Sequence, residues 1–126
     1  MAEHNDLGRS GENAAIEYLR KKEYLIRHIN WHYGHLELDI VAQTKDELVV
    51  VEVKTRSQKN WEMPEESVNY TKIKRIVAAT DHYIKHFDVD LSVRFDIISV
   101  VGVYPNFVIE HIEDAFYPPV NTYSRR

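Results

Sequence analysis

Apolar and polar residues follow a strand-like pattern in residues 36–56, near the middle of the chain. Residues 36–41 carry an apolar side chain at every second position, which is the period of a half-buried strand. Residues 48–53 are almost entirely apolar and β-branched, as expected of a strand that is covered on both faces. A polar turn over residues 43–47 separates the two runs, so the pattern predicts a β-hairpin.

Charged residues interrupt both strands of this hairpin. If a tight turn at residues 45–46 closes it, counting outward places Asp39 opposite Glu52. The same register places Glu37 opposite Lys54. Directly opposed residues share a face and lie about 5 Å apart at Cβ, and a shift of one residue would turn every side chain to the other face. With a two-residue turn, the sequence predicts that carboxylates and an ammonium converge at one point of the sheet.

Helices and further strands flank the hairpin. A first helix is capped by Asn5 or Asp6 and runs to about Lys22, and a strand follows over residues 24–31. After the hairpin, a second helix starts between Pro64 and Thr71 and ends near Phe87. Two more strands cover residues 93–101 and 107–112. The second helix carries a core-facing apolar stripe at spacings of three and four residues, and the first strand offers Leu25, Ile26 and Ile29 as core candidates. Gly8 and Gly11 weaken the first helix, which indicates close approach to another backbone or to a substrate.

The predicted elements form an α/β fold, a mixed β-sheet of about five strands flanked by helices. At 126 residues the chain is long enough for one domain with a real core. We assign that domain to residues 1–117, followed by a flexible tail over residues 118–126. Residues 57–66 are polar and are predicted to form a loop beside the hairpin.

Composition narrows the classes of function. The absence of cysteine excludes disulfides and thiolate zinc sites, and it fits a reducing cytoplasm. The polar start of the chain lacks a signal sequence, and no apolar run approaches the roughly 20 residues that span a bilayer, so we expect a cytoplasmic protein without a membrane partner. The net charge of −4 argues mildly against a nucleic-acid partner, although local clusters and bound cations can override a global sum.

The predicted convergence of carboxylates suggests a chemistry. Close carboxylates repel each other, and burying them is costly without a cation. Magnesium takes oxygen ligands, usually one or two carboxylates together with waters and substrate phosphate. A nearby lysine can hold or polarise an attacking water. Asp39, Glu52 and Lys54 are therefore suited to metal-assisted hydrolysis of a phosphodiester.

Glu12 adds a further carboxylate from the first helix. It stands three, four and seven residues before Ala15, Ile16 and Leu19, so helical spacing places it on the same inward stripe. A carboxylate on a buried face needs a partner. The alternative is a glutamate near the start of the helix that the helix dipole favours.

Basic and histidine side chains have competing interpretations. Lys72 belongs to a basic run at the start of the second helix, which is either a solvated face or a contact surface for phosphates. His28, His32 and His35 have spacings that resemble zinc-ligand pairs, but they lie on a predicted strand and turn with no residue to complete the set. We interpret them as solvated or hydrogen-bonded, and Asp96 as a structural hydrogen-bonding residue.

Three ordered motifs carry a resemblance to a known family. They are Gly8-Arg9-x-Gly11-Glu12-x-x-Ala15, Glu37-Leu38-Asp39-Ile40-Val41-Ala42 and Val51-Glu52-Val53-Lys54-Thr55-Arg56. Together with Lys72 and Arg94-Phe95-Asp96, they resemble the YraN-like family of small uncharacterised bacterial proteins. That family is predicted to contain nucleases of the PD-(D/E)xK, restriction-endonuclease-like type, distantly related to archaeal Holliday junction resolvases. The resemblance covers about residues 8–112. One departure is that Leu36 precedes Glu37, where the family pattern has a glycine.

The resemblance implies a restriction-endonuclease-like sheet with a magnesium or manganese ion at its centre. Asp39 and Glu52 would bind the metal directly, with the backbone carbonyl of Val53 as a third protein ligand. Glu12 would act through a water or a second ion. Lys54 would orient the nucleophilic water and help to deprotonate it, so that Glu12, Asp39, Glu52 and Lys54 form the catalytic set.

The resemblance also implies partners. Arg9, Arg56 and Lys72 are candidates for contacts with the nucleic-acid backbone. Resolvase relatives act as dimers, so the resemblance also makes a homodimer one candidate state of assembly.

The leading hypothesis is a metal-dependent endonuclease that hydrolyses DNA phosphodiester bonds, with branched or structured DNA as candidate substrates. The alternative is a non-catalytic module on a nuclease fold that binds nucleic acid or a protein, which the acidic balance favours. A third interpretation makes Glu37, Lys54 and their neighbours cross-strand ion pairs of a structural protein. Such surface pairs contribute about 0–1 kcal/mol and need no metal, but they do not explain Glu12 on an apolar stripe.

Overall fold

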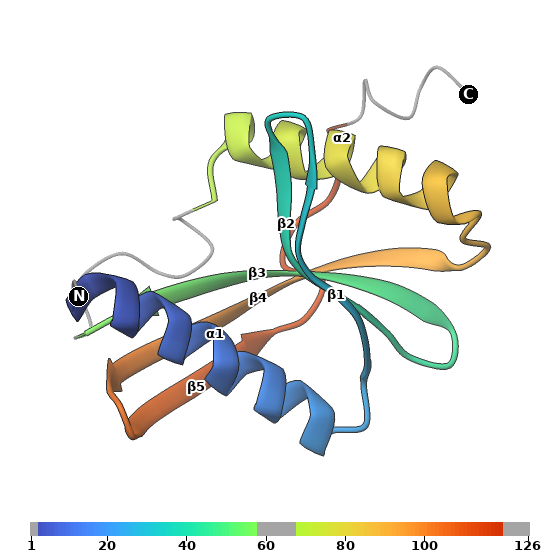
Figure 1. Ribbon diagram of the computed structural model, residues 1–126. Helices are drawn as coiled ribbons and strands as arrows, with labels where there is room; N and C mark the ends of the chain where they lie inside the picture. The colour runs from blue at the N-terminus through green and yellow to red at the C-terminus, as the bar shows by residue number, and fades with distance from the viewer. Residues whose placement is uncertain (1–2, 58–67, 120–126) are drawn as a thin grey trace.

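The computed structural model describes residues 3–57 and 68–119 of the protein. In chain order the elements are α1 (Glu3–Lys21), β1 (Leu25–Tyr33), β2 (Leu36–Gln43), β3 (Glu47–Arg56), α2 (Tyr70–Phe87), β4 (Ser92–Val103) and β5 (Asn106–Ile112). The strands form one sheet in the order β1-β2-β3-β4-β5. The predicted α/β fold with a mixed sheet of five strands and flanking helices is confirmed (Figure 1). Residues 58–66 of the predicted loop, residue 67 and residues 120–126 of the predicted tail lie outside the described part.

The sheet is mixed because one of its four pairings is parallel. β3 and β4 run parallel, whereas β1–β2, β2–β3 and β4–β5 are antiparallel. A parallel pair needs a long crossover connection, and α2 lies in that connection. This crossover carries α2 over one face of the sheet and brings its first turn beside β3.

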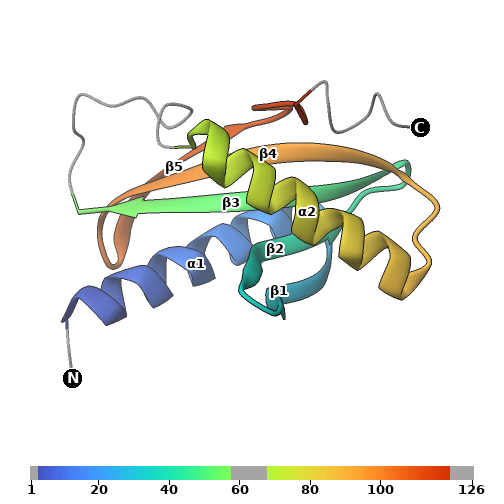
Figure 2. The same ribbon diagram turned by 90° about the horizontal axis from the view of Figure 1, so that it is seen from above.

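The two helices cover opposite faces of the sheet (Figure 2). On β3, Val49 and Val51 pack into the cluster that contains Leu19 of α1. Leu48 and Val50 pack into the cluster that contains Tyr83 of α2. Both faces of β3 are therefore buried, which explains why its sequence is a continuous apolar run rather than an alternating one.

The predicted register of the central hairpin is confirmed where the ladder forms. Gln43 pairs with Leu48, and the pairing continues in step to Ile40 and Val51. The ladder ends there. The carboxylate of Asp39 accepts a hydrogen bond of 2.9 Å from the backbone N–H of Val53, and the rest of the β1–β2 hairpin curves out of the plane of β3–β5 toward α2 (Figure 1).

The end of the ladder corrects one prediction. Glu37 does not oppose Lys54, because the β2–β3 pairing stops before it. Glu37 instead pairs with His32 on β1, and their side chains lie 3.6 Å apart. The strong twist of the hairpin separates the outer part of β2 from β3, a distortion that simple counting from the turn does not include.

Two local predictions are also wrong. α1 already includes Asn5 and Asp6, since it begins at Glu3, so neither residue is the cap. Leu25 and Ile29 are 61% and 41% exposed rather than in the core. They lie on β1, an edge strand whose pairing with β2 shifts at an irregularity between Ile26 and His28. Such a shift changes which side chains face the core.

The predicted start, end and apolar stripe of the second helix are confirmed, since α2 runs from Tyr70 to Phe87. Its cap, which was not predicted, is Asn69, whose side chain accepts a hydrogen bond from the backbone N–H of Lys72. The predicted stripe faces the core, with Ile76, Thr80 and Tyr83 buried. In the described part of the chain, neither helix combines the length and apolar character of a membrane span.

Candidate functional site

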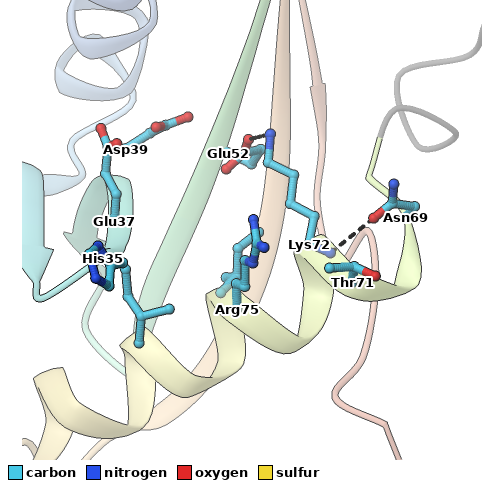
Figure 3. A pocket seen from close by; sticks show the side chains of 10 residues that line it. His35, Glu37, Asp39, Glu52, Asn69, Thr71, Lys72 and Arg75 are labelled. Carbon is cyan, nitrogen blue, oxygen red and sulfur yellow. Dashed lines mark hydrogen bonds and ion pairs between the residues drawn. The ribbon is translucent and has the colours of Figure 1, made fainter.

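Three elements meet at the point where β2 leaves β3. Asp39 comes from β2, Glu52 from β3 and Lys72 from the first turn of α2. These three residues line two cavities of about 460 and 600 Å³. Figure 3 shows the smaller cavity, with Glu52 and Lys72 in contact and Asp39 beside them. The predicted convergence of Asp39 and Glu52 is thus present, and the break in the ladder opens space around it.

Asp39 lies in a strongly acidic environment. Burial raises its pKa, and the negative charge of Glu52 raises it further. The hydrogen bond from the backbone of Val53 lowers the pKa, but more distant repulsion from Glu12 and Glu37 opposes that effect. The net result is a pKa of about 7 for Asp39. Negative charge at this site therefore exceeds what the surrounding groups compensate.

Lys72 is the cation that contacts this acidic group. Its ammonium forms an ion pair with Glu52, whose side chain is only 12% exposed. Partial burial opposes the charge of Lys72, but the bond to Glu52 and the nearby charges of Asp39 and Glu37 outweigh it and raise the pKa of Lys72. Lys72 was predicted to contact nucleic acid, and its pairing with Glu52 was not predicted.

Glu12 faces the site rather than bulk solvent. It is half-buried and lines the larger cavity, and it accepts a hydrogen bond of 3.1 Å from the side chain of Asn30. Asn30 adopts a φ of 53°, a conformation that Asn tolerates better than most residues. Nothing in the sequence pattern indicated Asn30, because its role depends on this local backbone conformation.

A close helix–strand contact fixes the position of Glu12. A Cβ atom added to Gly11 would lie 2.3 Å from the Oγ1 of Thr55 on β3. A Cβ atom at Gly8 would meet nothing within 4 Å, and Gly8 itself lines the larger cavity. The two glycines therefore serve different purposes. Gly11 lets α1 approach β3, while Gly8 borders open space.

The other predicted site residues divide into two groups. Arg9, Val53 and Lys54 line the larger cavity together with Glu12. Arg56 lies outside the linings of both cavities; it is 9% exposed and donates a hydrogen bond of 3.3 Å to the hydroxyl of Ser99. The four predicted catalytic residues thus surround one space, and Arg56 does not border it.

The smaller cavity brings in side chains that sequence reasoning did not assign to the site. His35 approaches from the turn between β1 and β2, and Asn69 and Thr71 from the start of α2. Arg75, part of the basic run at the start of α2, reaches the same cavity. Sequence signals existed for the helix start and the basic run. No local pattern indicated that the hairpin turn would lie against α2.

The donor atoms around Asp39 fit a hard divalent cation. Among the described residues, no three acidic, histidine or cysteine side chains form a complete metal site by themselves. Magnesium and manganese do not need such a set, because they retain waters and often use only one or two carboxylates. Asp39, Glu52 and the carbonyl of Val53 supply oxygen donors, and the raised pKa of Asp39 indicates uncompensated negative charge.

Asp96 and the histidines of β1 have structural partners. Asp96 is fully buried and forms ion pairs with Arg94 and His111 at 2.8 and 2.7 Å. Burial opposes its charge, but its hydrogen bonds with His111 and Arg94 prevail and lower its pKa. His28 contacts the hydroxyl of Tyr83 at 2.6 Å. The interpretation of these residues as hydrogen-bonding groups is confirmed.

Comparison with known sequences gives a consistent result. A family model described as "Uncharacterised protein family UPF0102" matches residues 11–100. A UPF0102 protein from Bacteroides thetaiotaomicron is 60% identical over 120 residues, which covers 95% of this chain and 99% of the relative. Relatives from Phocaeicola vulgatus and Flavobacterium psychrophilum are 57% and 49% identical, covering 95% and 93% of this chain and 99% and 98% of their own lengths.

Proposed function

The chain belongs to the uncharacterised protein family UPF0102, the YraN-like family that its motifs resemble, and we propose that it is a metal-dependent endonuclease that hydrolyses DNA phosphodiester bonds. The observation that carries this proposal is the convergence of two carboxylates beside a cavity that Glu12 and Lys54 also line. Carboxylates that repel each other at a recessed site favour binding of a cation, and oxygen donors favour magnesium or manganese.

Asp39, Glu52 and the carbonyl of Val53 would hold the cation. When bound, it would supply Lewis acidity, activating a water and stabilising charge on the phosphate. The ammonium of Lys72 and the divalent cation compete for Glu52, since both are positive and Lys72 already contacts that carboxylate. Once displaced from Glu52, the ammonium of Lys72 would lie beside the site with its charge available to a phosphate oxygen.

The remaining residues have positioning and binding roles. Lys54 lines the larger cavity, where its ammonium orients the attacking water and faces the scissile phosphate. Glu12, held by Asn30, acts through a second water on the same side. Arg9 and Lys72 contact backbone phosphates. Arg56 supports the sheet through Ser99, so we assign it no direct contact with substrate.

A second candidate function is a module that binds nucleic acid or a protein without cutting. One observation favours it: the ion pair with Lys72 satisfies Glu52 without any metal. The net charge of −4 points in the same direction. The two functions differ in whether manganese-dependent cleavage exists.

The first prediction tests cleavage directly. Purified protein is incubated with duplex, single-stranded, flap and four-way junction DNA, with manganese or with EDTA. We expect cleavage of at least one substrate that requires the metal. Lys54→Met reduces the rate by roughly 10²–10⁴-fold, the usual contribution of an acid–base group. Glu52→Gln removes a carboxylate assigned to the cation and should reduce the rate at least as much.

Matched variants on the surface serve as controls. Glu110→Gln on β5 and Lys45→Met at the β2–β3 turn change the same residue types at exposed positions outside the cavity linings, and should cleave like wild type. Equal cleavage by Glu52→Gln and wild type would contradict the proposal. Retained DNA binding with no cleavage of any substrate favours the binding module.

A further inference from the structure

The two cavities at the site share three of their lining residues. Asp39, Glu52 and Lys72 line both of them, so the cavities meet at the acidic pair. The larger cavity extends from these residues toward the N-terminal half of α1, and the smaller one extends between the β1–β2 turn and α2. The acidic pair therefore lies between the two cavities, which we call the two arms of one groove.

Each arm of the groove has its own cationic side chain. In the larger cavity, besides Lys54, this is Arg9, an exposed residue of α1 next to Gly8, whose missing side chain leaves open space. In the smaller cavity it is Arg75, an exposed residue one turn after Lys72 on α2. Figure 3 shows Lys72 and Arg75 rising from the same side of α2 toward β3.

Neutral hydrogen-bonding groups complete both arms. Asn30 lies in the larger cavity, and Asn69 and Thr71 lie in the smaller one, with His35 facing them from the hairpin turn. Arginine with amide and hydroxyl donors is the typical lining of a surface that contacts phosphate and sugar groups. Cations on both sides of an acidic centre fit a chain of phosphates better than a single phosphate group.

We propose that one nucleic-acid strand lies across both arms, with an internal phosphodiester at Asp39 and Glu52, one flanking phosphate on Arg9 and another on Arg75. This inference rests on the proposed function and adds the path of the strand through the site and the residues that hold it on each side of the bond that is cut. It assigns the space between the β1–β2 turn and α2 as a second binding arm, with Arg75 as its anchor.

The test measures binding separately from cleavage. Binding of a labelled single-stranded oligonucleotide is followed by fluorescence anisotropy in EDTA and in calcium, over a series of salt concentrations. Arg9→Ala and Arg75→Ala should each weaken binding several-fold and each lower the slope of log K against log salt by about 0.7, the value for one phosphate contact on a single strand. Arg20→Ala, an exposed position on α1 outside both linings, is the control and should leave both quantities unchanged.

The double variant distinguishes one strand across both arms from two independent sites. If one strand spans the groove, the losses in log K from Arg9→Ala and Arg75→Ala add. If each arm binds a strand by itself, either single variant keeps nearly full affinity because the other arm still binds. That result, or an unchanged salt slope in Arg75→Ala, would overturn the inference.

Failure of this inference is separable from failure of the proposed function. A small phosphodiester such as bis(p-nitrophenyl) phosphate reaches the acidic pair without filling either arm. Manganese-dependent hydrolysis of this compound, combined with wild-type DNA binding by Arg75→Ala, would retain the nuclease and reject the groove. Additive losses of binding without any hydrolysis would retain the groove and reject the nuclease.

Discussion

Asp39 is the residue on which the site depends, because its charge is poorly compensated by its neighbours. Its carboxylate is largely buried near Glu52 and, among the described residues, receives one backbone hydrogen bond, from Val53. The loss of stability caused by the poorly compensated charge can be measured without substrate. It appears in the pH dependence of stability, since the pKa of Asp39 is about 7 in the folded protein and 3.8 in its ordinary environment.

Asp39→Asn should stabilise the metal-free protein in a pH-dependent way. A raised folded pKa means that stability from protonated Asp39 is present below about pH 4 and is lost as pH rises to about 7. The amide keeps an acceptor for the Val53 N–H but carries no charge. We expect no gain near pH 4 and a gain of about 4 kcal/mol above pH 7, at about 1.4 kcal/mol per pKa unit.

Calorimetric melting in EDTA across that pH range checks this expectation. Asp46→Asn, at the exposed β2–β3 turn, is the matched control and should show no comparable gain. A gain that is the same at every pH, or a loss of stability at pH 8, would show that the charge of Asp39 is not the cause.

Lys72 should compete with the metal. Lys72→Met removes the ammonium that contacts Glu52, so a divalent cation no longer has to displace it. We expect tighter binding of manganese in calorimetric titrations without nucleic acid. The affinity should rise about tenfold for each 1.4 kcal/mol that the metal no longer spends on displacing Lys72 from Glu52. Before metal is added, the variant should be less stable than wild type, because a largely buried carboxylate has lost its partner.

Lys85 provides the comparison on the same helix. It forms an ion pair of 3.1 Å with Asp81 on the exposed face of α2. Lys85→Met should therefore leave manganese affinity unchanged. Weaker or unchanged metal binding in Lys72→Met would mean that Lys72 helps to build the site rather than competing for it.

At the scale of elements, the site depends on how closely α1 approaches β3. The added Cβ of Gly11→Ala would lie 2.3 Å from the Oγ1 of Thr55, whereas that of Gly8→Ala would meet nothing within 4 Å. Both changes replace glycine by alanine in the same helix. Gly8→Ala should stabilise by about 0.5–1 kcal/mol through helix propensity, and Gly11→Ala should destabilise by about 1–3 kcal/mol through overpacking.

Free energies of unfolding from urea titrations test this contrast. Adding Thr55→Ala to Gly11→Ala removes the two nearest atoms and should restore part of the lost stability. Equal effects of the two glycine substitutions would indicate that the helix–strand distance is not limiting. The predicted close approach would then not explain how Glu12 is positioned.

The β1–β2 hairpin has a comparable role on the other side of the site. Its pairing with β3 stops at Ile40 and Val51, and its turn then lies near α2. A regular ladder would have closed the space that His35 and Arg75 line. The early end of the ladder therefore creates the smaller cavity.

At the scale of the whole molecule, a buried polar network lies apart from the two cavities of the site and ties the strands of the sheet together. Arg94 bonds to Asp96 on its own strand, to Glu47 at the start of β3 and to Tyr24 before β1. His111 of β5 joins the same network through Asp96. These bonds connect β3, β4 and β5 and compensate the charge of Asp96, whereas Asp39 and Glu52 lie next to open cavities.

Much of this organisation could be predicted from the sequence because it has a local cause. The alternation in β2, the continuous apolar run of β3 and the stripe of α2 each reflect burial at a fixed repeat. The two-residue turn fixed the register that places Asp39 beside Glu52. The apolar spacing after Glu12 indicated that this residue faces inward. The side chains of edge strand β1 were predicted less well. The register of β1 against β2 shifts between Ile26 and His28, so simple alternation assigns some of its side chains to the wrong face of the sheet.

The sequence by itself determined the order of elements, the hairpin register and the convergence of acidic residues, since each follows from contacts between residues close in the chain. Only the tertiary structure decided that Lys72 pairs with Glu52, that Asn30 holds Glu12, and that two cavities meet at one acidic pair. These features depend on the crossover of α2 and the twist of the β1–β2 hairpin. Both bring together residues whose relative positions no local repeat specifies.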